Sequence, residues 1–291
     1  MTSVENRFQA GKKFSEYSTF GIGGPIRFYF EATEVSDFVE AFRWALSQKV
    51  PYFILGKGSN CLFDDRGWDG LVIRNRIEFC EIEECAVSVG AGYSFSLLGS
   101  QTARRGLSGL EFAAGIPATV GGAVYMNAGA SGWETFDCLS EVLFLDEEGE
   151  TRVFAKSELT WDYRFSAFQK MRGAILSARF ALKQKSEAQE VHRLLIKKRI
   201  ETQPLKEKSA GCIFRNPPGA AAGALIDRCG LKGLQVGGAK VSEVHANFIV
   251  NNASAKAADV RELIREVQQR VFEKTGIHLD PEIRWVSFEE I

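Results

Sequence analysis

The spacing of apolar residues predicts amphipathic helices near both ends of the chain. Apolar residues recur at helical spacing over 35–46, after Thr33, a residue type that caps helices, and before Pro51. A longer stretch, 260–271, carries five apolar residues on one helical face and ends before Gly276, a typical C-terminal cap. Short apolar runs typical of strands lie between them, at 51–55, 71–73, 86–89 and 142–145. The pattern therefore predicts a fold built from both helices and strands.

Two further helices are predicted between these stretches. One begins after Ser94 and ends at Gly106. The other begins near position 191, and its inward residues are Val191, Leu194 and Leu195. Its outward residues are basic: Arg193, Lys197, Lys198 and Arg199. A row of like charges on a helix is most often a solvated face, and we interpret this one in that way.

Glycine turns and one polar run divide the chain into three parts. The first helix and its flanking strands form a lobe over 1–76, and short strands with one helix form a second lobe over 77–186. The polar run KQKSEAQE at 183–190 marks the boundary of a C-terminal domain, 187–291. The expected fold class is α+β, because a chain of 291 residues has room for two or three such domains.

Composition and charge exclude several classes of protein. The net charge is −1, so the chain as a whole does not attract nucleic acid or an anionic membrane. We find no N-terminal signal sequence and no run of about 18 apolar residues, and we expect a cytoplasmic protein without a membrane span. The six cysteines and three histidines lack the spacing of metal ligands, which predicts that no metal is bound. Nothing in the sequence indicates an obligate protein partner.

The segment 109–130, GLEFAAGIPATVGGAVYMNAGA, is too rich in glycine for a packed helix and too apolar for a solvated linker. Glycine is retained where the main chain turns sharply or approaches a ligand closely. The loop GKGSN at 56–60 follows a predicted strand, and its backbone N–H groups can bind phosphate oxygens. The dinucleotide and P-loop fingerprints are both missing. Two interpretations stay open at this point: a cradle for a flat, phosphate-bearing cofactor, or tight turns between buried strands.

Eight motifs, distributed along the chain, make the interpretation specific. They are TFGIGG at 19–24, LGKGSN at 55–60, GIPATVGG at 115–122, NAG at 127–129, YRFS at 163–166, AGCIFRNP at 210–217, GGAKVS at 237–242 and PEIR at 281–284. The series resembles the UDP-N-acetylenolpyruvoylglucosamine reductases, flavoproteins of bacterial peptidoglycan synthesis, in the shorter branch that lacks a tyrosine-bearing insertion. The resemblance implies a two-lobed FAD-binding domain of the vanillyl-alcohol-oxidase type, followed by a small α+β substrate-binding domain.

The resemblance also implies the cofactors and the reaction. FAD would be bound non-covalently, and NADPH would supply the hydride. From N5 of the reduced flavin the hydride would pass to the enolpyruvyl double bond of UDP-N-acetylglucosamine enolpyruvate, giving UDP-N-acetylmuramate. The family pattern assigns FAD binding to Gly56, Lys57, Gly58, Ser59, Asn60, Gly115, Thr119, Gly121, Gly122, Asn127 and Gly129.

Three residues match the catalytic positions of the family. Arg164 would bind the substrate carboxylate, because a guanidinium offers two parallel N–H groups and stays charged. Glu282 would polarise the developing enol or relay a proton. Cys212 stands where the family usually has serine, and its thiol, with an ordinary pKa of about 8.5, would protonate the carbanionic carbon. The alternative is that Cys212 only packs and another group delivers the proton.

Substrate contacts are assigned by the same match to Tyr163, Arg164, Asn216 and Arg284. Two other functions stay open. One is an oxidase of the same FAD fold that acts on a sugar or alcohol, and the other is a catalytically silent nucleotide-binding module. The joint presence of Arg164, Cys212 and Glu282 argues against the silent module, because a binding protein does not need an acid beside a reacting carbon.

Overall fold

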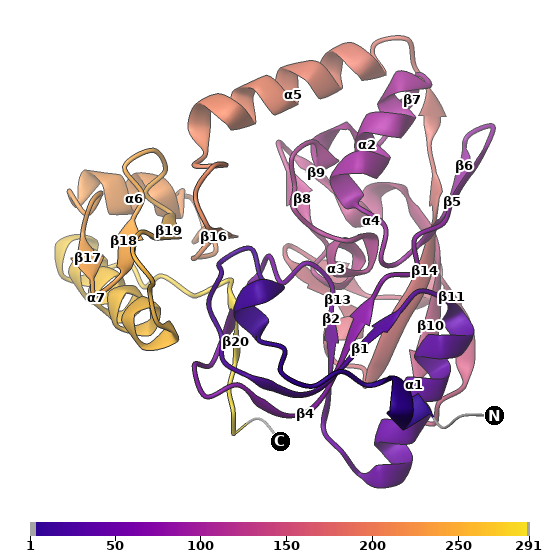
Figure 1. The fold of residues 1–291 in the computed structure, drawn as a ribbon. Helices are drawn as coiled ribbons and strands as arrows, with labels where there is room; N and C mark the ends of the chain where they lie inside the picture. Colours follow the sequence, from indigo (N-terminus) through magenta and orange to yellow (C-terminus); the bar gives the residue numbers. More distant parts are fainter. Residues whose placement is uncertain (1–3, 290–291) are drawn as a thin grey trace. The chain divides into compact units, whose positions relative to one another are not determined.

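The computed structural model describes residues 4–289, which form two compact units (Figure 1). Among these residues, unit 1 comprises 4–9, 28–57 and 70–199, and unit 2 comprises 10–27, 58–69 and 200–289. Two early segments join the C-terminal one because Phe20, Ile22 and Leu62 belong to the hydrophobic core of unit 2. The three predicted lobes divide the chain at other positions and stay a prediction.

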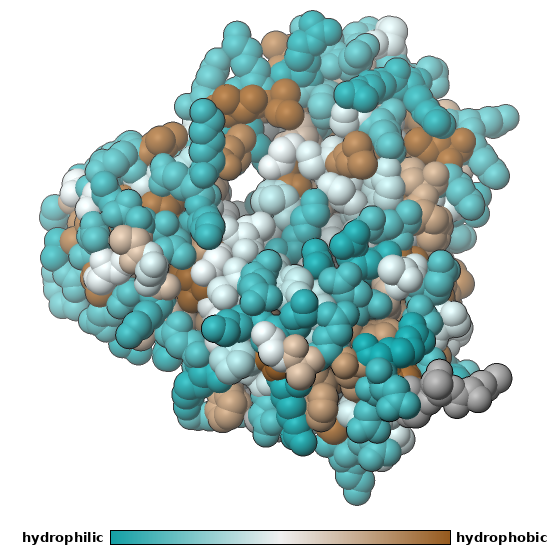
Figure 2. Space-filling view, in the orientation of Figure 1, coloured by the Kyte–Doolittle hydropathy of each residue, from teal (hydrophilic) through white to brown (hydrophobic). Residues whose placement is uncertain are grey.

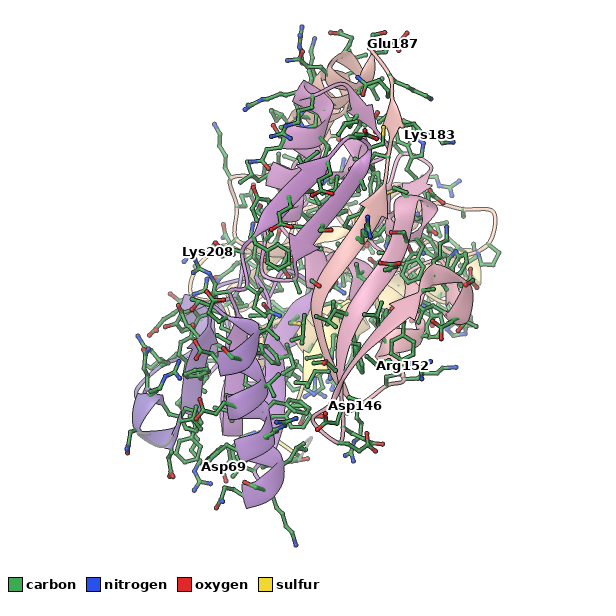
Figure 3. All side chains as sticks on the ribbon, turned by 90° about the vertical axis from the view of Figure 1, so that its right-hand side faces the viewer. Asp69, Asp146, Arg152, Lys183, Glu187 and Lys208 are labelled. Atoms are coloured by element: carbon green, nitrogen blue, oxygen red, sulfur yellow. The ribbon has the colours of Figure 1, made fainter. Side chains whose placement is uncertain are left out.

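Unit 1 contains a three-stranded and a five-stranded sheet (Figure 1). The smaller sheet has the order β1-β4-β2, with β1 Ile26–Ala32, β2 Tyr52–Leu55 parallel to β4 Trp68–Asn75. The larger sheet is antiparallel, in the order β11-β10-β14-β6-β5. Its strands are β5 Cys80–Glu83, β6 Ala86–Gly90, β10 Leu139–Asp146, β11 Thr151–Ala155 and β14 Gly173–Ala181. In Figure 3, Asp146 labels the end of β10, and Lys183 lies two residues beyond the end of β14.

The larger sheet separates two cores of unit 1, because successive side chains of a strand point to opposite faces. On β14, Ala174 and Leu176 belong to one core and Ile175 to the other. Phe180 also belongs to the second core, because the β10–β14 pairing has a register shift between Leu143 and Phe144 that changes the alternation. The first core also receives the buried face of α1 Val35–Gln48. The second is covered by α2 Phe95–Arg104, α3 Val120–Tyr125 and α4 Thr135–Cys138.

Unit 2 is built around a four-stranded antiparallel sheet in the order β16-β19-β18-β17. The strands are β16 Ser209–Cys212, β17 Gln235–Val236, β18 Ala239–Val241 and β19 Phe248–Asn251. The helices α6 Ala222–Arg228 and α7 Ala257–Thr275 pack in its core. A separate parallel pair joins β3 Cys61–Phe63 to β20 Arg284–Val286.

The remaining elements are short, apart from α5 Ala188–Thr202. The short strand pairs are β7 Leu107–Ser108 with β15 Lys183–Gln184, β8 Gly129–Ala130 with β9 Trp133–Glu134, and β12 Trp161–Asp162 with β13 Phe165–Ser166. The 3-10 helices are Val4–Arg7, Phe14–Glu16, Glu111–Ala113, Lys156–Glu158 and Ala167–Gln169.

Several predictions about local structure are confirmed and three are wrong. The five apolar positions of α7 are buried, and Gly276 caps this helix in the left-handed conformation. The N-cap of α1 is Glu34 rather than Thr33. A packed helix, α3, does form inside the glycine-rich segment, because tertiary packing outweighs the low helix propensity of glycine. Leu194 was expected inside but is 57% exposed, and Figure 2 shows apolar side chains on the surface of α5.

Candidate active site

In unit 1, the loop after β2 meets the residue that precedes α3. A Cβ atom on Gly56 would lie 2.6 Å from Thr119 Oγ1, so only glycine permits this approach. Thr119 caps α3 and accepts a hydrogen bond from the Gly122 N–H at 3.2 Å. Lys57 Nζ donates to Ser94 Oγ at 2.9 Å, and burial lowers the pKa of the lysine. Three predicted cofactor residues, Gly56, Lys57 and Thr119, are therefore close together.

The first turn of α3 packs against a neighbouring strand end through glycine. The Gly121 N–H donates to the Ala91 carbonyl at 2.9 Å, and a Cβ atom on Gly121 would lie 2.9 Å from Ala91 Cβ. Gly122 is less constrained, since its Cβ atom would lie 3.4 Å from Thr119 Oγ1. A half-buried lysine beside closely approaching glycine backbone has the charge and shape that a pyrophosphate requires, so these residues fit FAD.

Gly115 opens the predicted flavin-binding segment and lies next to α5. Its φ is +69°, and its N–H donates to Ser96 Oγ at 2.9 Å. A Cβ atom on Gly115 would lie 3.0 Å from Arg199 Cδ. The stem of Arg199 therefore packs against this backbone, and Arg199 is partly buried, whereas Arg193, Lys197 and Lys198 on the same helix are exposed.

Arg164 lies against the other end of the predicted flavin-binding segment. Its Nη2 donates to the Gly129 carbonyl at 3.0 Å, and its guanidinium lies 4.9 Å from the Tyr163 ring centroid. Gln169 Nε2 donates to the Arg164 carbonyl at 3.1 Å. Arg164 has a φ of +57°, a conformation that is uncommon for a residue other than glycine.

Asn127 fixes the turn between these groups. Its side chain is buried, and its Nδ2 donates to Glu134 Oε2 at 2.8 Å and to the Asp162 carbonyl at 3.0 Å. Its Oδ1 accepts from the Phe136 N–H at 3.1 Å. These three bonds give Asn127 a role within the protein, holding the chain at 127–129 next to the segment that carries Tyr163 and Arg164.

In unit 2, Cys212 follows a β-bulge. Ser209 pairs with Val250 whereas Cys212 pairs with Phe248, so β16 has one more residue than β19 over this stretch. Gly211 lies inside the bulge with a φ of +78°. A bulge shifts the alternation of side chains and is frequent next to active sites. Gly211 therefore permits the bulge, and the bulge changes the direction in which the next residue, Cys212, points.

Glu282 lies between the bridge residue Pro281 and β20, next to the segment that follows Cys212. Its N–H donates to the Ile213 carbonyl at 2.7 Å, and its carbonyl accepts from Asn60 Nδ2 at 3.2 Å. The Arg284 N–H donates to the Asn60 carbonyl at 2.9 Å. Unit 2 therefore joins three predicted site residues, Asn60, Glu282 and Arg284, in one hydrogen-bonded ladder, which is bonded to Ile213, the residue after Cys212.

The other predicted residues of unit 2 have separate positions. Gly58 has a φ of +59°, and a Cβ atom there would lie 3.0 Å from Ser18 Cα. Ser59 follows Gly58 in the same loop. Asn216 Oδ1 accepts from the Ala222 N–H at 3.0 Å, which ties Asn216 to the start of α6 rather than to the ladder.

Sequence reasoning missed two residues that hold the site. Ser94 was interpreted only as a helix cap, yet its hydroxyl accepts from Lys57. Asn247, which is 3% exposed, bonds to Phe214 through its side chain, and no motif spacing indicated this contact.

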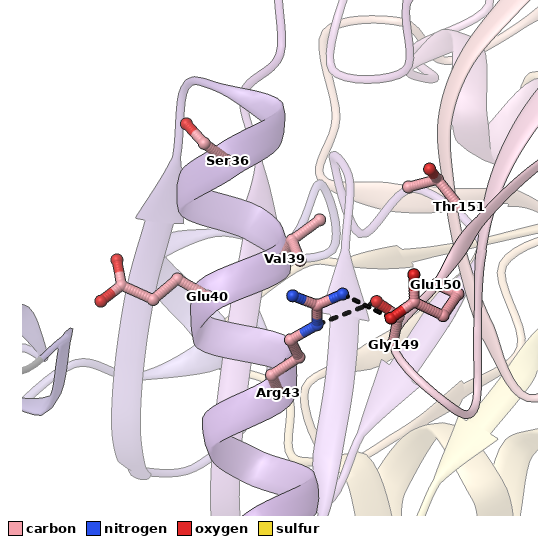
Figure 4. Close-up of a pocket in the computed structure, with 7 residues that line it drawn as sticks. All are labelled: Ser36, Val39, Glu40, Arg43, Gly149, Glu150 and Thr151. Carbon is pink, nitrogen blue, oxygen red and sulfur yellow. Dashed lines mark hydrogen bonds and ion pairs between the residues drawn. The ribbon is translucent and has the colours of Figure 1, made fainter.

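A surface pocket of about 470 Å³ lies elsewhere in unit 1, between α1 and the turn that joins β10 to β11 (Figure 4). Arg43 crosses it, donating to the Gly149 carbonyl at 3.0 Å and to Glu150 Oε1 at 2.8 Å. None of its lining residues matches a family motif: Ser36, Val39, Glu40, Arg43, Gly149, Glu150 and Thr151. Within 4–289, no cluster of three potential metal ligands occurs, and no helix is long and apolar enough to cross a membrane.

Comparison with known proteins identifies the family. Residues 26–155 match an FAD binding domain, and residues 203–286 match the C-terminal domain of UDP-N-acetylenolpyruvoylglucosamine reductase. A protein of that name from Protochlamydia amoebophila is 52% identical, covering 98% of this chain and 96% of the relative. A Chlamydia trachomatis relative is 47% identical, covering 96% of each chain.

A solved structure agrees with these sequence matches. The crystal structure of UDP-N-acetylenolpyruvylglucosamine reductase (MurB) from Thermus caldophilus superimposes with a TM-score of 0.81 at 39% identity, covering 96% of this chain and all of that one. The expected fold class, an FAD-binding domain followed by a smaller α+β domain, is therefore confirmed. Because the chain is 52% and 47% identical to two relatives over 96% of their length, it belongs to the UDP-N-acetylenolpyruvoylglucosamine reductase family.

Proposed function

We propose that this chain is an NADPH-dependent flavoprotein reductase that converts UDP-N-acetylglucosamine enolpyruvate to UDP-N-acetylmuramate for peptidoglycan synthesis. Its membership of the family over nearly the whole chain supports this reaction. The oxidase and the silent binding module are not favoured, because every relative named above carries the reductase name.

FAD, when bound, supplies a two-electron carrier between NADPH and the enolpyruvyl group. Gly56, Lys57 and Thr119 would hold its pyrophosphate, with Gly121 and Gly122 permitting close approach. The half-buried Lys57 would place one positive charge beside the phosphates in a chain whose net charge is only −1. Gly115, Asn127 and Gly129 would line the rest of the cofactor site.

Arg164 would bind the substrate carboxylate. Charge develops on this carboxylate as hydride adds to the double bond, and a guanidinium already fixed in place stabilises that charge without reorganising. The bond to Gly129, the Tyr163 ring and the Gln169 bond to its backbone restrict how Arg164 can move. Asn216 and Arg284 would contact other parts of the sugar nucleotide.

Cys212 would donate the proton that completes reduction, and Glu282 would polarise the enol or relay that proton. The observation that carries this assignment is the 2.7 Å hydrogen bond from the Glu282 N–H to the Ile213 carbonyl. It makes the backbone that bears the carboxyl group the direct neighbour of the strand that bears the thiol. General acid catalysis of this kind typically contributes about 10²- to 10⁴-fold to a rate.

Spectroscopy and turnover test the function directly. The purified protein should be yellow and should oxidise NADPH only when the enolpyruvyl sugar nucleotide is present. A colourless protein that cannot be reconstituted with FAD would contradict the proposal, and so would rapid NADPH oxidation that ignores the sugar nucleotide. Intact mass after denaturation should equal the polypeptide alone, since we propose that FAD is not covalently attached.

We also propose that the enzyme acts in the cytoplasm and without an obligate protein partner. The six cysteines, all within 4–289, form no disulfide bond, as expected in a reducing compartment. Cell fractionation tests the location. Turnover by the purified chain alone tests the second point, and a requirement for an added cell fraction would contradict it.

A further inference from the structure

The side chain of Asn247 pairs with the main chain of the segment that follows Cys212. Its Oδ1 accepts from the Phe214 N–H at 2.9 Å, and its Nδ2 donates to the Phe214 carbonyl at 2.8 Å. The amide thus satisfies both backbone groups of one residue, which a neighbouring β-strand would otherwise do. Asn247 is 3% exposed and Phe214 is 2% exposed, so water does not compete for these bonds.

The backbone of Asn247 adds a third bond to the same segment. Its carbonyl accepts from the Ile213 N–H at 2.8 Å, one residue after Cys212. The β16–β19 pairing ends at Cys212 with Phe248, immediately after the bulge at Gly211. The hydrogen bonds of Asn247 therefore begin where the β16–β19 pairing ends, and they fix the direction of the chain after Cys212.

The opposite edge of the same segment bears Glu282. Phe214 forms a β-bridge with Pro281, the Glu282 N–H donates to the Ile213 carbonyl, and the Arg215 N–H donates to the Asp280 carbonyl. The segment 213–215, which follows β16, is therefore held by Asn247 along one edge and by 280–282 along the other. A shift of Phe214 would disturb both the backbone that leads from Cys212 and the bonds that hold Glu282 beside it, and so would change the position of Cys212 relative to Glu282.

We propose that Asn247 is a positioning residue for proton delivery, fixing the backbone that follows Cys212 against the segment that carries Glu282. This inference rests on the proposed function, in which Cys212 and Glu282 act on the reduced substrate. Asn247 itself touches neither the thiol nor the carboxyl group through the bonds described, and it acts through Phe214 and Ile213. Misplacing catalytic groups by about 1 Å can cost about 10²-fold in rate.

Unit 1 provides a matched control. Asn75 is 4% exposed, and it likewise uses both ends of its amide on backbone groups: Nδ2 donates to the Ile175 carbonyl at 3.1 Å, and Oδ1 accepts from the Ile77 N–H at 3.1 Å. Asn75→Ala removes the same two kinds of bond from a buried site that carries no predicted catalytic residue. Asn75→Ala therefore measures the loss of stability that follows when a buried asparagine side chain no longer makes its two hydrogen bonds to the backbone.

The experiment separates the two half-reactions by rapid mixing under anaerobic conditions. In Asn247→Ala, reduction of the enzyme by NADPH should proceed at the wild-type rate. Reoxidation by the enolpyruvyl sugar nucleotide should slow about 10- to 100-fold, with the loss in kcat and not in KM. Asn75→Ala should lower the Tm to a similar extent and leave both half-reactions unchanged. Asn247→Ser offers one hydroxyl group to the two backbone groups of Phe214 and should be less impaired than Asn247→Ala. It replaces the alanine variant in this experiment if that variant does not fold.

The outcomes distinguish this inference from the proposed function. If wild-type enzyme is not reoxidised by the sugar nucleotide, the function itself is wrong. If reoxidation is normal in Cys212→Ala, the proton comes from elsewhere and the inference loses its basis. If Cys212→Ala is blocked but folded Asn247→Ala and Asn247→Ser are reoxidised at the wild-type rate, or if both half-reactions slow equally, the positioning role of Asn247 is overturned.

Discussion

Unit 1 and unit 2 hold their candidate residues in different ways. In unit 1 most of them lie in one run of chain, 115–129, and glycine allows the backbone to come close to Thr119 and Ala91. In unit 2 they lie on segments far apart in sequence, around positions 60, 212 and 282, joined by backbone hydrogen bonds. The first arrangement is suited to surrounding a flat cofactor, and the second to fixing single catalytic side chains.

The difference predicts how each unit responds to substitution. In unit 1, where close approach of the glycine backbone to its neighbours forms the site, adding a single Cβ atom should disturb packing and the retention of FAD. In unit 2, hydrogen bonds between distant segments form the site. Backbone hydrogen bonds survive most side-chain changes, so the chemistry there depends on the side chain at one position. Four sets of substitutions test this contrast, beginning with the largest expected effect.

Replacing Cys212 should have the largest effect. Cys212→Ala should lower the rate of product formation by about 10²- to 10⁴-fold, because the proposed acid is lost while the ladder stays intact. Cys212→Ser should retain substantial activity. Stopped-flow absorbance of the flavin and product analysis measure the two steps. Cys229→Ala, which removes a buried thiol from the core of unit 2, is the control. Normal turnover in Cys212→Ala would remove the contrast, since unit 2 would then contribute no acid at this position.

Arg164 tests whether unit 1 contributes chemistry as well as cofactor binding. Arg164→Met should lower kcat/KM about 10²- to 10³-fold, since one preorganised donor to developing charge is lost. Arg164→Lys should recover only part of the rate, because an ammonium cannot offer two parallel N–H groups. Retention of FAD should be unchanged in both variants. Loss of FAD in Arg164→Lys would instead assign this residue to the cofactor.

Two adjacent glycines of α3 separate packing from cofactor contact. Gly121→Ala places a Cβ atom 2.9 Å from Ala91 Cβ, whereas Gly122→Ala meets Thr119 Oγ1 at 3.4 Å. Both gain helix propensity, so Gly121→Ala should be less stable than Gly122→Ala by about 1–3 kcal/mol, the cost of overpacking. Thermal unfolding of the apoprotein measures this difference.

Flavin content then reports on the cofactor itself. Gly122→Ala should keep the stability of the apoprotein and lose FAD more readily, if glycine at this position serves close approach to the cofactor. Equal FAD retention in Gly122→Ala and wild type would confine the role of Gly122 to the fold.

Asp64 tests the outer part of the unit 2 ladder, with the smallest expected effect. Its backbone N–H continues the β3–β20 pairing to Val286 at 3.0 Å, and hydrogen bonds from Arg66 hold the pKa of its carboxyl at about 2. A carboxyl whose pKa is lowered on folding stabilises the protein above its unfolded pKa of about 3.9 and loses that contribution as the pH falls toward 2. Because Arg66 is half exposed, Asp64→Asn should cost only about 1 kcal/mol at pH 7.

The pH dependence makes the Asp64 prediction specific. The wild type should lose stability relative to Asp64→Asn as the pH is lowered from about 4 to 2, since the variant has no carboxyl to protonate there. Chemical denaturation at a series of pH values measures this. A constant difference across that range would mean that the Arg66 bonds do not stabilise the folded state.

Much of the fold could be predicted because the information is local. The α7 stripe from Val260 to Val271 and its Gly276 cap follow from helical periodicity and from the freedom of glycine to adopt a positive φ. The helix inside the glycine-rich segment could not be predicted, because Gly121 is tolerated there only through its contact with Ala91. The exposed Leu194 shows the same limit, since amphipathic spacing does not say whether a partner surface is present.

The sequence by itself determined the family, the α+β class and the identity of the candidate groups, because motif spacing preserves the residue types that a reaction needs. Tertiary structure alone decided how the groups are held. The segment that carries Glu282 lies against the residues that follow Cys212, and the Asn247 side chain completes the opposite edge, through hydrogen bonds between residues tens of positions apart. Such pairings depend on which buried backbone groups lack a neighbour once the chain has folded, and local pattern does not encode this.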